Sequence, residues 1–159
     1  MEPDAFFDFV TDMEERKKWD QRFEENKLVE EDKEENRAIV YVKTKPPPVP
    51  VIGQRDLLMT VFACKHAFGE NRHVSVGQSC EHPDYPENSG WFGGGLIRAH
   101  VHLLGALVEP NPNGKGTMFT EIRFVDAKGN IPDGAIKQLS KIMGKENYHI
   151  LKTQVLKIS

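Results

Sequence analysis

The stretch LIRAHVHLLGALVEPNPNGKGTMFTEIRFVDAKGNIPDGAIKQLSKIM, residues 96–143, decides the fold. Apolar and polar residues alternate through Leu96–Val108 and through Thr117–Val125, which predicts two strands that each have one apolar face. The turn residues NPNGKG between them predict that these strands are antiparallel neighbours. A helix is predicted from Pro132 to Lys157, because proline is favoured in the first turn of a helix.

The faces of these three elements predict a core. The apolar face of the first strand carries Ile97, Ala99, Val101 and Leu103, that of the second carries Met118, Thr120, Ile122 and Phe124, and that of the helix carries Ile136, Leu139, Met143 and Ile150. A sheet whose apolar face lies under one amphipathic helix satisfies this pattern. Loose contact between the sheet and the helix would leave an apolar cavity.

The residues before this stretch predict further elements. Apolar residues recur at three- and four-residue spacing over Pro3–Phe23, which predicts a helix. Four more strands are predicted over Lys27–Glu31, Ala38–Thr44, Leu57–Lys65 and His73–Cys80. The predicted fold class is α+β, a curved antiparallel sheet of six strands wrapped on a long C-terminal helix.

Composition limits the class of protein. The chain has 159 residues, 38% of them hydrophobic and 28% charged, which fits one domain over residues 1–159. The net charge is −3, without the basic excess of a nucleic-acid binder, so no nucleic-acid partner is expected. No apolar run approaches the roughly 18 residues of a membrane span, and MEPDAFFDF does not resemble a secretory signal. The two cysteines fit a reducing compartment, so a cytoplasmic protein is predicted.

Known catalytic motifs are missing from the sequence. There is no Gly-x-Ser-x-Gly, P-loop, His-Glu-x-x-His or dinucleotide motif, so no enzyme, catalytic residue or cofactor is predicted. His100 and His102 project from one face of a strand, but no third metal ligand is evident nearby. No metal site is therefore predicted, and cross-strand pairing with Glu121 is the alternative. Cys64 and Cys80 are predicted to be free thiols.

Several segments resemble, in order, those of the steroidogenic-acute-regulatory-protein-related lipid-transfer (START) domains. They are ERKKWD (15–20), AIVYVK (38–43), QRDLL (54–58), SCEHPDYP (79–86), IRAH (97–100), LVEP (107–110) and DAKGNIP (126–132). The resemblance implies a helix-grip fold of the START and Bet v 1 type, with a lipid cavity between the sheet and the last helix. It also implies non-catalytic binding and transfer of one sterol, phospholipid or sphingolipid molecule.

Two departures from the family shape the expected ligand and oligomeric state. START domains usually begin with another helix and about three strands, so an upstream segment is expected to be missing and Lys27–Glu31 to be an open edge. An apolar sheet face left uncovered by that loss would favour a dimer, whereas the acidic residues beside this edge favour a monomer, and the state stays open. The charged pair of sterol-binding members aligns near Val42 and Val61, which predicts an acyl-chain phospholipid or sphingolipid rather than free sterol.

The resemblance and the strand faces together predict a lipid site. Its walls are predicted to be Val40, Val42, Met59, Val61, Val76, Ala99, Val101, Leu103, Thr120 and Ile122, and its roof Leu139 and Met143. Two alternatives to lipid transfer stay open. One is a helix-grip enzyme of the cyclase or hydrolase type, and the other is an interaction module with a vestigial cavity.

Two surface features predict how lipid would enter. The loop KTKPPPVPVIGQ (43–54) is predicted to be a lid with an apolar tip of Val49, Val51 and Ile52, although its P-x-x-P also fits an SH3 ligand. On the last helix, one face carries Lys137, Lys141, Lys145, His149 and Lys152. These lysines are predicted either to dock transiently on an anionic membrane or only to be solvated.

Three residues are predicted to have structural roles rather than a role in binding lipid. Arg55 and Asp56 are predicted to close the loop before a strand, with a lipid-site pair as the alternative. Trp19 is predicted to pack in the core, because a large aromatic side chain on a helix face usually fills one.

Overall fold

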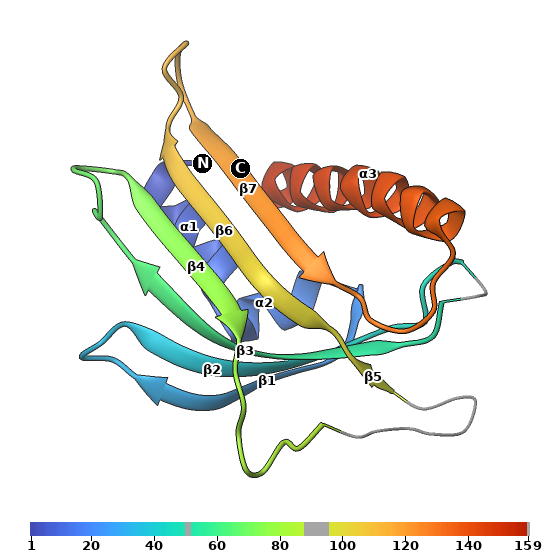
Figure 1. Cartoon of the computed structure of the whole chain (residues 1–159). Coiled ribbons are helices and arrows are strands. Elements are labelled where there is room, and N and C mark those ends of the chain that lie inside the picture. Colours follow the sequence, from blue (N-terminus) through green and yellow to red (C-terminus); the bar gives the residue numbers. More distant parts are fainter. Residues whose placement is uncertain (50–51, 88–95, 159) are drawn as a thin grey trace.

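The computed structural model describes residues 1–49, 52–87 and 96–158. Its elements are α1 (Pro3–Thr11), α2 (Met13–Trp19), β1 (Phe23–Asp32), β2 (Arg37–Thr44), β3 (Arg55–Cys64), β4 (His73–Ser79), β5 (Ile97–Arg98), β6 (His100–Pro110), β7 (Thr117–Asp126) and α3 (Asp133–Ile158). The fold is the predicted α+β helix-grip arrangement, a curved antiparallel sheet with a long C-terminal helix beside it (Figure 1).

The single N-terminal helix predicted over Pro3–Phe23 is in fact two helices. The helix is interrupted at Asp12. The Asp12 carboxylate accepts hydrogen bonds from the backbone N–H groups of Glu14 (2.8 Å) and Glu15 (3.0 Å). Aspartate stabilises a helix start in this way, so Asp12 begins α2 where continuous apolar spacing had predicted one helix.

The sheet follows the order β1-β2-β3-β4-β6-β7, with antiparallel neighbours throughout. Within the described residues, β1 and β7 are its two edges, so the predicted edge at Lys27–Glu31 is confirmed. The strand predicted over Leu96–Val108 is interrupted at Ala99. Before that point, β5 leaves the line of β6 and pairs in parallel with the start of β3.

The two faces of the sheet have different coverings. We call the face that carries Val40, Met59 and Val101 the inner face; there these residues pack with Met13 of α2. Further along the inner face, the α1 side chains Phe6 and Phe7 cover a second cluster. On the opposite, outer face, a third cluster packs under the segment that follows β4. Its members are Ile39, Tyr41, Leu58, Val29, Cys80 and Tyr85.

A bulge in β6 changes which residues face inward. The register with β7 shifts between Val101 and Leu103, so one extra residue is inserted at His102. After the bulge, Leu104 lies on the inner face and is paired with Arg123, whereas Leu103 lies on the outer face and is paired with Phe124. The predicted faces are therefore wrong for Leu103 and for all of β7.

The helix α3 begins after a tight turn and runs alongside β7 towards α1 (Figure 1). Gly129 in this turn has a φ of 76°, and a Cβ there would lie 3.4 Å from Arg55. Near the other end of the helix, Val155 packs against the cluster under α1. Between these ends the apolar side chains of Ile136 and Met143 are 44% and 38% exposed, so α3 grips the sheet loosely.

Candidate lipid site

The predicted lipid-site residues divide between the two faces of the sheet. Val40, Val42, Met59, Val61 and Val101 lie on the inner face, where β2 and β3 pair Val40 with Met59. By contrast, Val76 is paired with Phe62 and with Gly105, which is itself paired with Ile122. The prediction of a shared face is wrong for Val76, Leu103, Thr120 and Ile122, because all four point outward.

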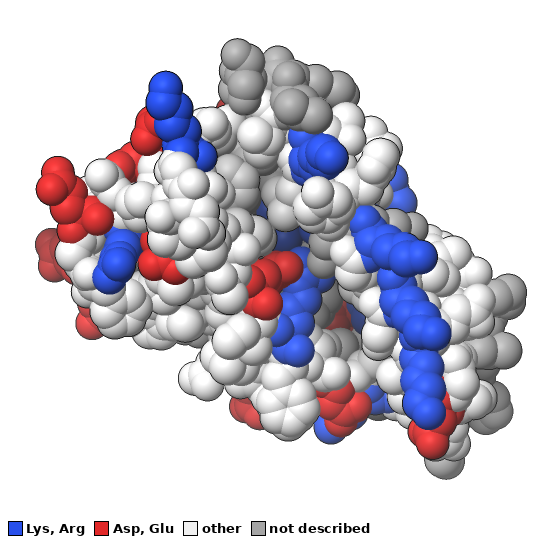
Figure 2. Space-filling view, turned by 90° about the horizontal axis from the view of Figure 1, so that it is seen from above, with Lys and Arg blue, Asp and Glu red and all other residues white. Residues whose placement is uncertain are grey.

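The remaining predicted members are a strand residue and the two roof residues. Ala99 is buried, and it also lines a pocket of about 580 Å³ where residues 80–87 pass over β5. That pocket has a mixed lining, with His82, Arg98 and His100 beside Pro83 and Tyr85. Leu139 is half-buried on α3, and Met143 is exposed. Figure 2 shows the surface hollowed beside α3.

Charged side chains also reach the inner face. We call these residues the inner polar cluster: Arg16, Asp20, Arg22, Glu121 and Arg123. Asp20, which is fully buried, accepts hydrogen bonds from Arg22 Nε (2.6 Å) and Arg16 Nε (3.2 Å). Burial alone would raise the pKa of Asp20, but the two arginines outweigh it and hold that pKa below its ordinary value.

The arginines of this cluster are held against an aromatic ring and a neighbouring strand. The guanidinium groups of Arg16 and Arg22 each lie 5.4 Å from the ring centroid of Phe23. On β7, Arg123 donates to Glu121 at 2.6 Å. Burial lowers the pKa of Arg16, and the charges of Arg22 and Arg123 lower it further, while Asp20 opposes them. Three cations face two carboxylates, so the cluster carries one excess positive charge.

The predicted lid lies against the protein. Val49 and Ile52 are both buried, with 4% of each residue exposed, so these two apolar side chains of the loop pack against the rest of the protein. Val51 lies outside the described residues. The backbone N–H of Lys45 donates to the carbonyl of Arg22 at 2.9 Å, which places the start of this loop beside the inner polar cluster.

Arg55 and Asp56 close loops, as predicted, and do not form a pair with each other. The Arg55 guanidinium donates to four backbone carbonyls, those of Ala127 (2.6 Å), Gly53 (2.6 Å), Lys128 (3.0 Å) and Gln54 (3.3 Å). Asp56 instead pairs with Arg98 at 2.8 Å. These bonds tie the start of β3 to the turn from which α3 begins.

The remaining predictions concern histidines, cysteines and one tryptophan. His100 is paired with Asp126 across the strands, and Glu121 is bonded to Arg123, so the expected contact between the histidines and Glu121 is wrong. Trp19 is buried and stacks on Phe9 with ring centroids 4.9 Å apart, which confirms its role in the core. Both thiols are free, as predicted.

Comparison with known proteins decides the family, because the START domain model matches residues 1–148. The chain belongs to the START-domain family. No curated protein sequence matches it.

Several solved structures share the fold. Human STARD10 is 22% identical with a TM-score of 0.80, over 99% of this chain and 59% of that chain. Human StAR-related lipid transfer protein 5 is 20% identical with a TM-score of 0.82, over 99% and 71%. The lipid transfer and protein localization domain of human StarD13 is 26% identical with a TM-score of 0.70, over 95% and 70%. The present START domain therefore spans less than two thirds of the STARD10 chain.

The basic face of α3 is exposed on this START domain. Figure 2 shows a row of basic side chains over α3, and Lys137, Lys141, Lys145 and Lys152 are all exposed. Among the described helices, none is long and apolar enough to cross a membrane.

Proposed function

We propose that this START domain binds one acyl-chain lipid between the inner face and α3 and transfers it between membranes, without catalysing a reaction. The observation that carries the proposal is the loose grip of α3, whose apolar side chains are exposed beside an apolar sheet face. An acyl chain that covered them would contribute about 0.8 kcal/mol for each buried methylene. The names of two of the similar structures, StAR-related lipid transfer protein 5 and the lipid transfer and protein localization domain of StarD13, support the same function.

The proposed binding surface is smaller than the sequence pattern indicated. Its wall is the inner-face set of Val40, Val42, Met59, Val61 and Val101, and its roof is Leu139 and Met143. Val42 and Val61 lie on this wall as apolar residues, which supports acyl chains over a sterol hydroxyl. In this proposal residues 1–159 act as one domain in the cytoplasm, with no nucleic-acid partner.

The inner polar cluster supports a phospholipid as the lipid. Its excess positive charge lies at the edge of an apolar wall, where a phosphate on a lipid headgroup would meet arginine donors. Among the described residues, the Nη atoms of Arg16 have no hydrogen-bond partner, so they are available to such a group.

Release of the lipid at a membrane is proposed to use α3. Its four exposed lysines form one face, and a lysine near an anionic surface contributes about 1 kcal/mol of binding. The loop over residues 43–54 would move with it, because Val49 and Ile52 must leave their buried positions for the loop to open.

An interaction module is the second candidate, because an apolar stripe crosses the outer face. It consists of Phe62, Val76, Leu103, Ile122 and Phe124, all at least 39% exposed, on neighbouring strands. A stripe of this kind is more typical of a contact surface than of a solvated sheet.

Native mass spectrometry of the protein purified from cells tests the proposed function. We expect a bound species with the mass of a phospholipid, released on denaturation, and uptake of a fluorescent phospholipid from vesicles. A protein that carries no lipid and takes none up would favour the interaction module.

Replacing Lys141 and Lys145 by glutamate should weaken binding to phosphatidylserine vesicles at least about thirtyfold, with no change on phosphatidylcholine vesicles.

Headgroup selection gives a second prediction. Arg123→Gln should lower the affinity for phosphatidic acid about tenfold, because a charge-assisted hydrogen bond contributes roughly 1.5 kcal/mol or more. Binding of a diacylglycerol with the same acyl chains should not change. Arg72→Gln is the matched control, since Arg72 pairs with Glu109 at 3.5 Å in a different part of the sheet. Equal loss for both lipids would remove Arg123 from headgroup recognition.

A further inference from the structure

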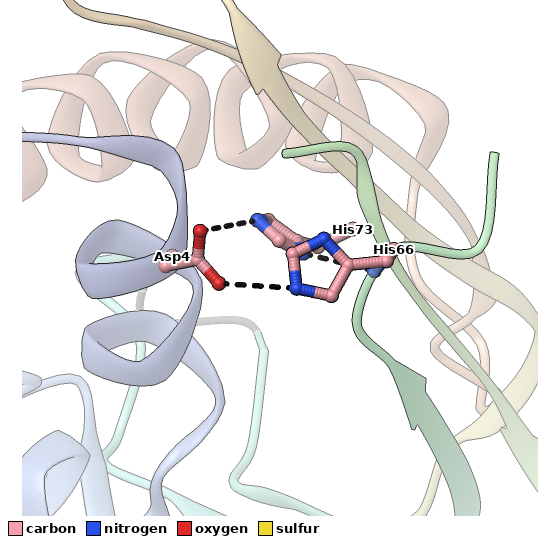
Figure 3. Close-up of side chains that lie close together, drawn as sticks. All are labelled: Asp4, His66 and His73. Atoms are coloured by element: carbon pink, nitrogen blue, oxygen red, sulfur yellow. Dashed lines mark hydrogen bonds and ion pairs between the residues drawn. The ribbon is translucent and has the colours of Figure 1, made fainter. Parts of the chain in front are cut away.

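Away from the lipid site, an aspartate and two histidines converge from different elements (Figure 3). Asp4 lies in the first turn of α1, His66 in the turn after β3, and His73 at the start of β4. The two Asp4 oxygens lie 3.6 Å from His66 Nε2 and 3.7 Å from His73 Nε2. His73 is completely buried, and its Nε2 has no hydrogen-bond partner among the described residues. These three residues join α1 to the β3–β4 hairpin.

The backbone around the two rings determines which nitrogen carries the proton. His73 Nδ1 accepts a hydrogen bond from the backbone N–H of His66 at 3.2 Å, and His66 Nδ1 accepts one from Asn71 at 3.2 Å. A ring nitrogen that accepts a hydrogen bond carries no hydrogen of its own, so each neutral ring has its hydrogen on Nε2. Both N–H groups are therefore directed at the Asp4 carboxylate.

The same hydrogen bonds argue against a metal ion between these residues, although their ligand atoms all lie within 4.8 Å. A cation at Nε2 needs the lone pair of that atom, and the hydrogen would have to move to Nδ1. In both rings, Nδ1 faces a backbone N–H group. Metal binding would therefore break two hydrogen bonds, one of them at a buried ring.

Protonation of His73 meets the same obstacle. A second proton on this ring must go to Nδ1, where the backbone N–H of His66 already donates. Burial lowers the pKa of His73 below 6.5; Asp4 and Asp8 of α1 oppose this, while His66 and Lys65 add to it. The ring of Phe7 in α1 also packs on the His73 ring, with the two ring centroids 5.2 Å apart.

We propose that Asp4, His66 and His73 form an acid-sensitive latch, which holds α1 on the β3–β4 hairpin at neutral pH and releases it in acid. Above pH 6.5, His73 is neutral whether α1 is docked or released. Below 6.5, the released form binds a proton that the docked form does not, so release becomes up to about tenfold more favourable for each pH unit. The equilibrium continues to shift towards release until the pH reaches the pKa of His73 in the docked form.

Release of α1 would affect the other end of the chain, because the end of α3 packs against α1. Phe6 and Phe7 of α1 share one cluster with Val108 of β6 and Val155 of α3. Undocking α1 removes Phe6 and Phe7 from this cluster and so loosens the last turns of α3. The latch itself does not depend on lipid binding, and it regulates the proposed transfer only through α3.

Hydrogen exchange between pH 7.0 and 5.5, corrected for the intrinsic pH dependence, tests the latch. We expect the protection of α1 amides to fall about tenfold, while β1 and β2 amides are unchanged. His73→Asn should abolish this fall, because asparagine keeps an acceptor near the place of Nδ1 but does not titrate. His66→Asn is the matched control and should retain the fall, since the backbone N–H of residue 66 still meets His73.

A pH-independent α1, or the same acid response in His73→Asn, would overturn the latch. If His73→Asn does not fold, an NMR titration of the wild-type His73 ring takes its place. A ring that titrates below 6.5 together with α1 resonances supports the latch, and one that titrates at or above 6.5 contradicts it.

Discussion

Asp56→Ala is expected to lower the free energy of unfolding by about 4 kcal/mol, because it leaves the charge of Arg98 buried without a carboxylate partner. The Asp56 carboxylate lies 2.8 Å from Arg98 Nη2, and the two side chains are only 6% and 13% exposed. Arg98 Nε lacks a partner among the described residues, and the other contacts of the guanidinium are a hydrogen bond of 3.4 Å to the carbonyl of Tyr85 and the ring of Tyr41 at 5.9 Å. Urea denaturation followed by circular dichroism measures the loss.

The double variant Asp56→Ala/Arg98→Met is the control for this prediction. Replacing both charges by apolar groups removes the uncompensated charge, so most of the lost stability should return. The double variant should therefore be more stable than the single variant. A loss below about 1 kcal/mol in the single variant would mean that the pair behaves like a solvated surface pair.

The family and the order of elements followed from the sequence because their signals are local. The DAKGNIP turn, the apolar run AIVYV of β2 and the last helix each depend on neighbouring residues, and all are present in the structure. The break at Asp12 was also a local signal, since aspartate followed by Glu14 and Glu15 is typical of a helix start. The continuous apolar spacing predicts a single helix across this signal, so the predicted boundary is wrong.

The inner face of β7 could not be predicted from alternation alone. A single extra residue at His102 reverses every side chain that follows in β6, and no residue type in that segment marks a bulge. Alternation predicts that Met118, Ile122 and Phe124 lie on the core face. In the structure, Glu121 and Arg123 lie on that face. The inner polar cluster is not evident in the sequence for a related reason, because its members come from α2, the turn after α2 and β7, and they meet only in the fold.

The two histidines of the latch also meet only through the fold. His66 lies in a turn and His73 begins a strand, seven residues apart, and Asp4 is far from both in sequence. The histidines whose spacing resembles that of metal ligands in the sequence are instead His100 and His102. In the structure their rings lie 4.6 Å apart, and that of His102 stacks on Phe124 at the outer face.

Arg55→Ala is expected to lower the free energy of unfolding by about 3 kcal/mol and to loosen the start of α3. The side chain is 8% exposed and donates to four carbonyls on two loops, so its removal leaves several buried acceptors unsatisfied.

Two measurements separate the loss of stability from the loosening of α3. For a domain of this size, the thermal midpoint should fall by about 10 °C. Limited proteolysis at a temperature where the variant is folded should cut next to Lys128, at the loop that Arg55 holds. Arg55→Lys should lie between wild type and Arg55→Ala, because an ammonium group cannot reach both loops with the planar geometry of a guanidinium. Cleavage at the wild-type rate in Arg55→Ala would show that the turn before α3 is held by its own backbone and not by Arg55.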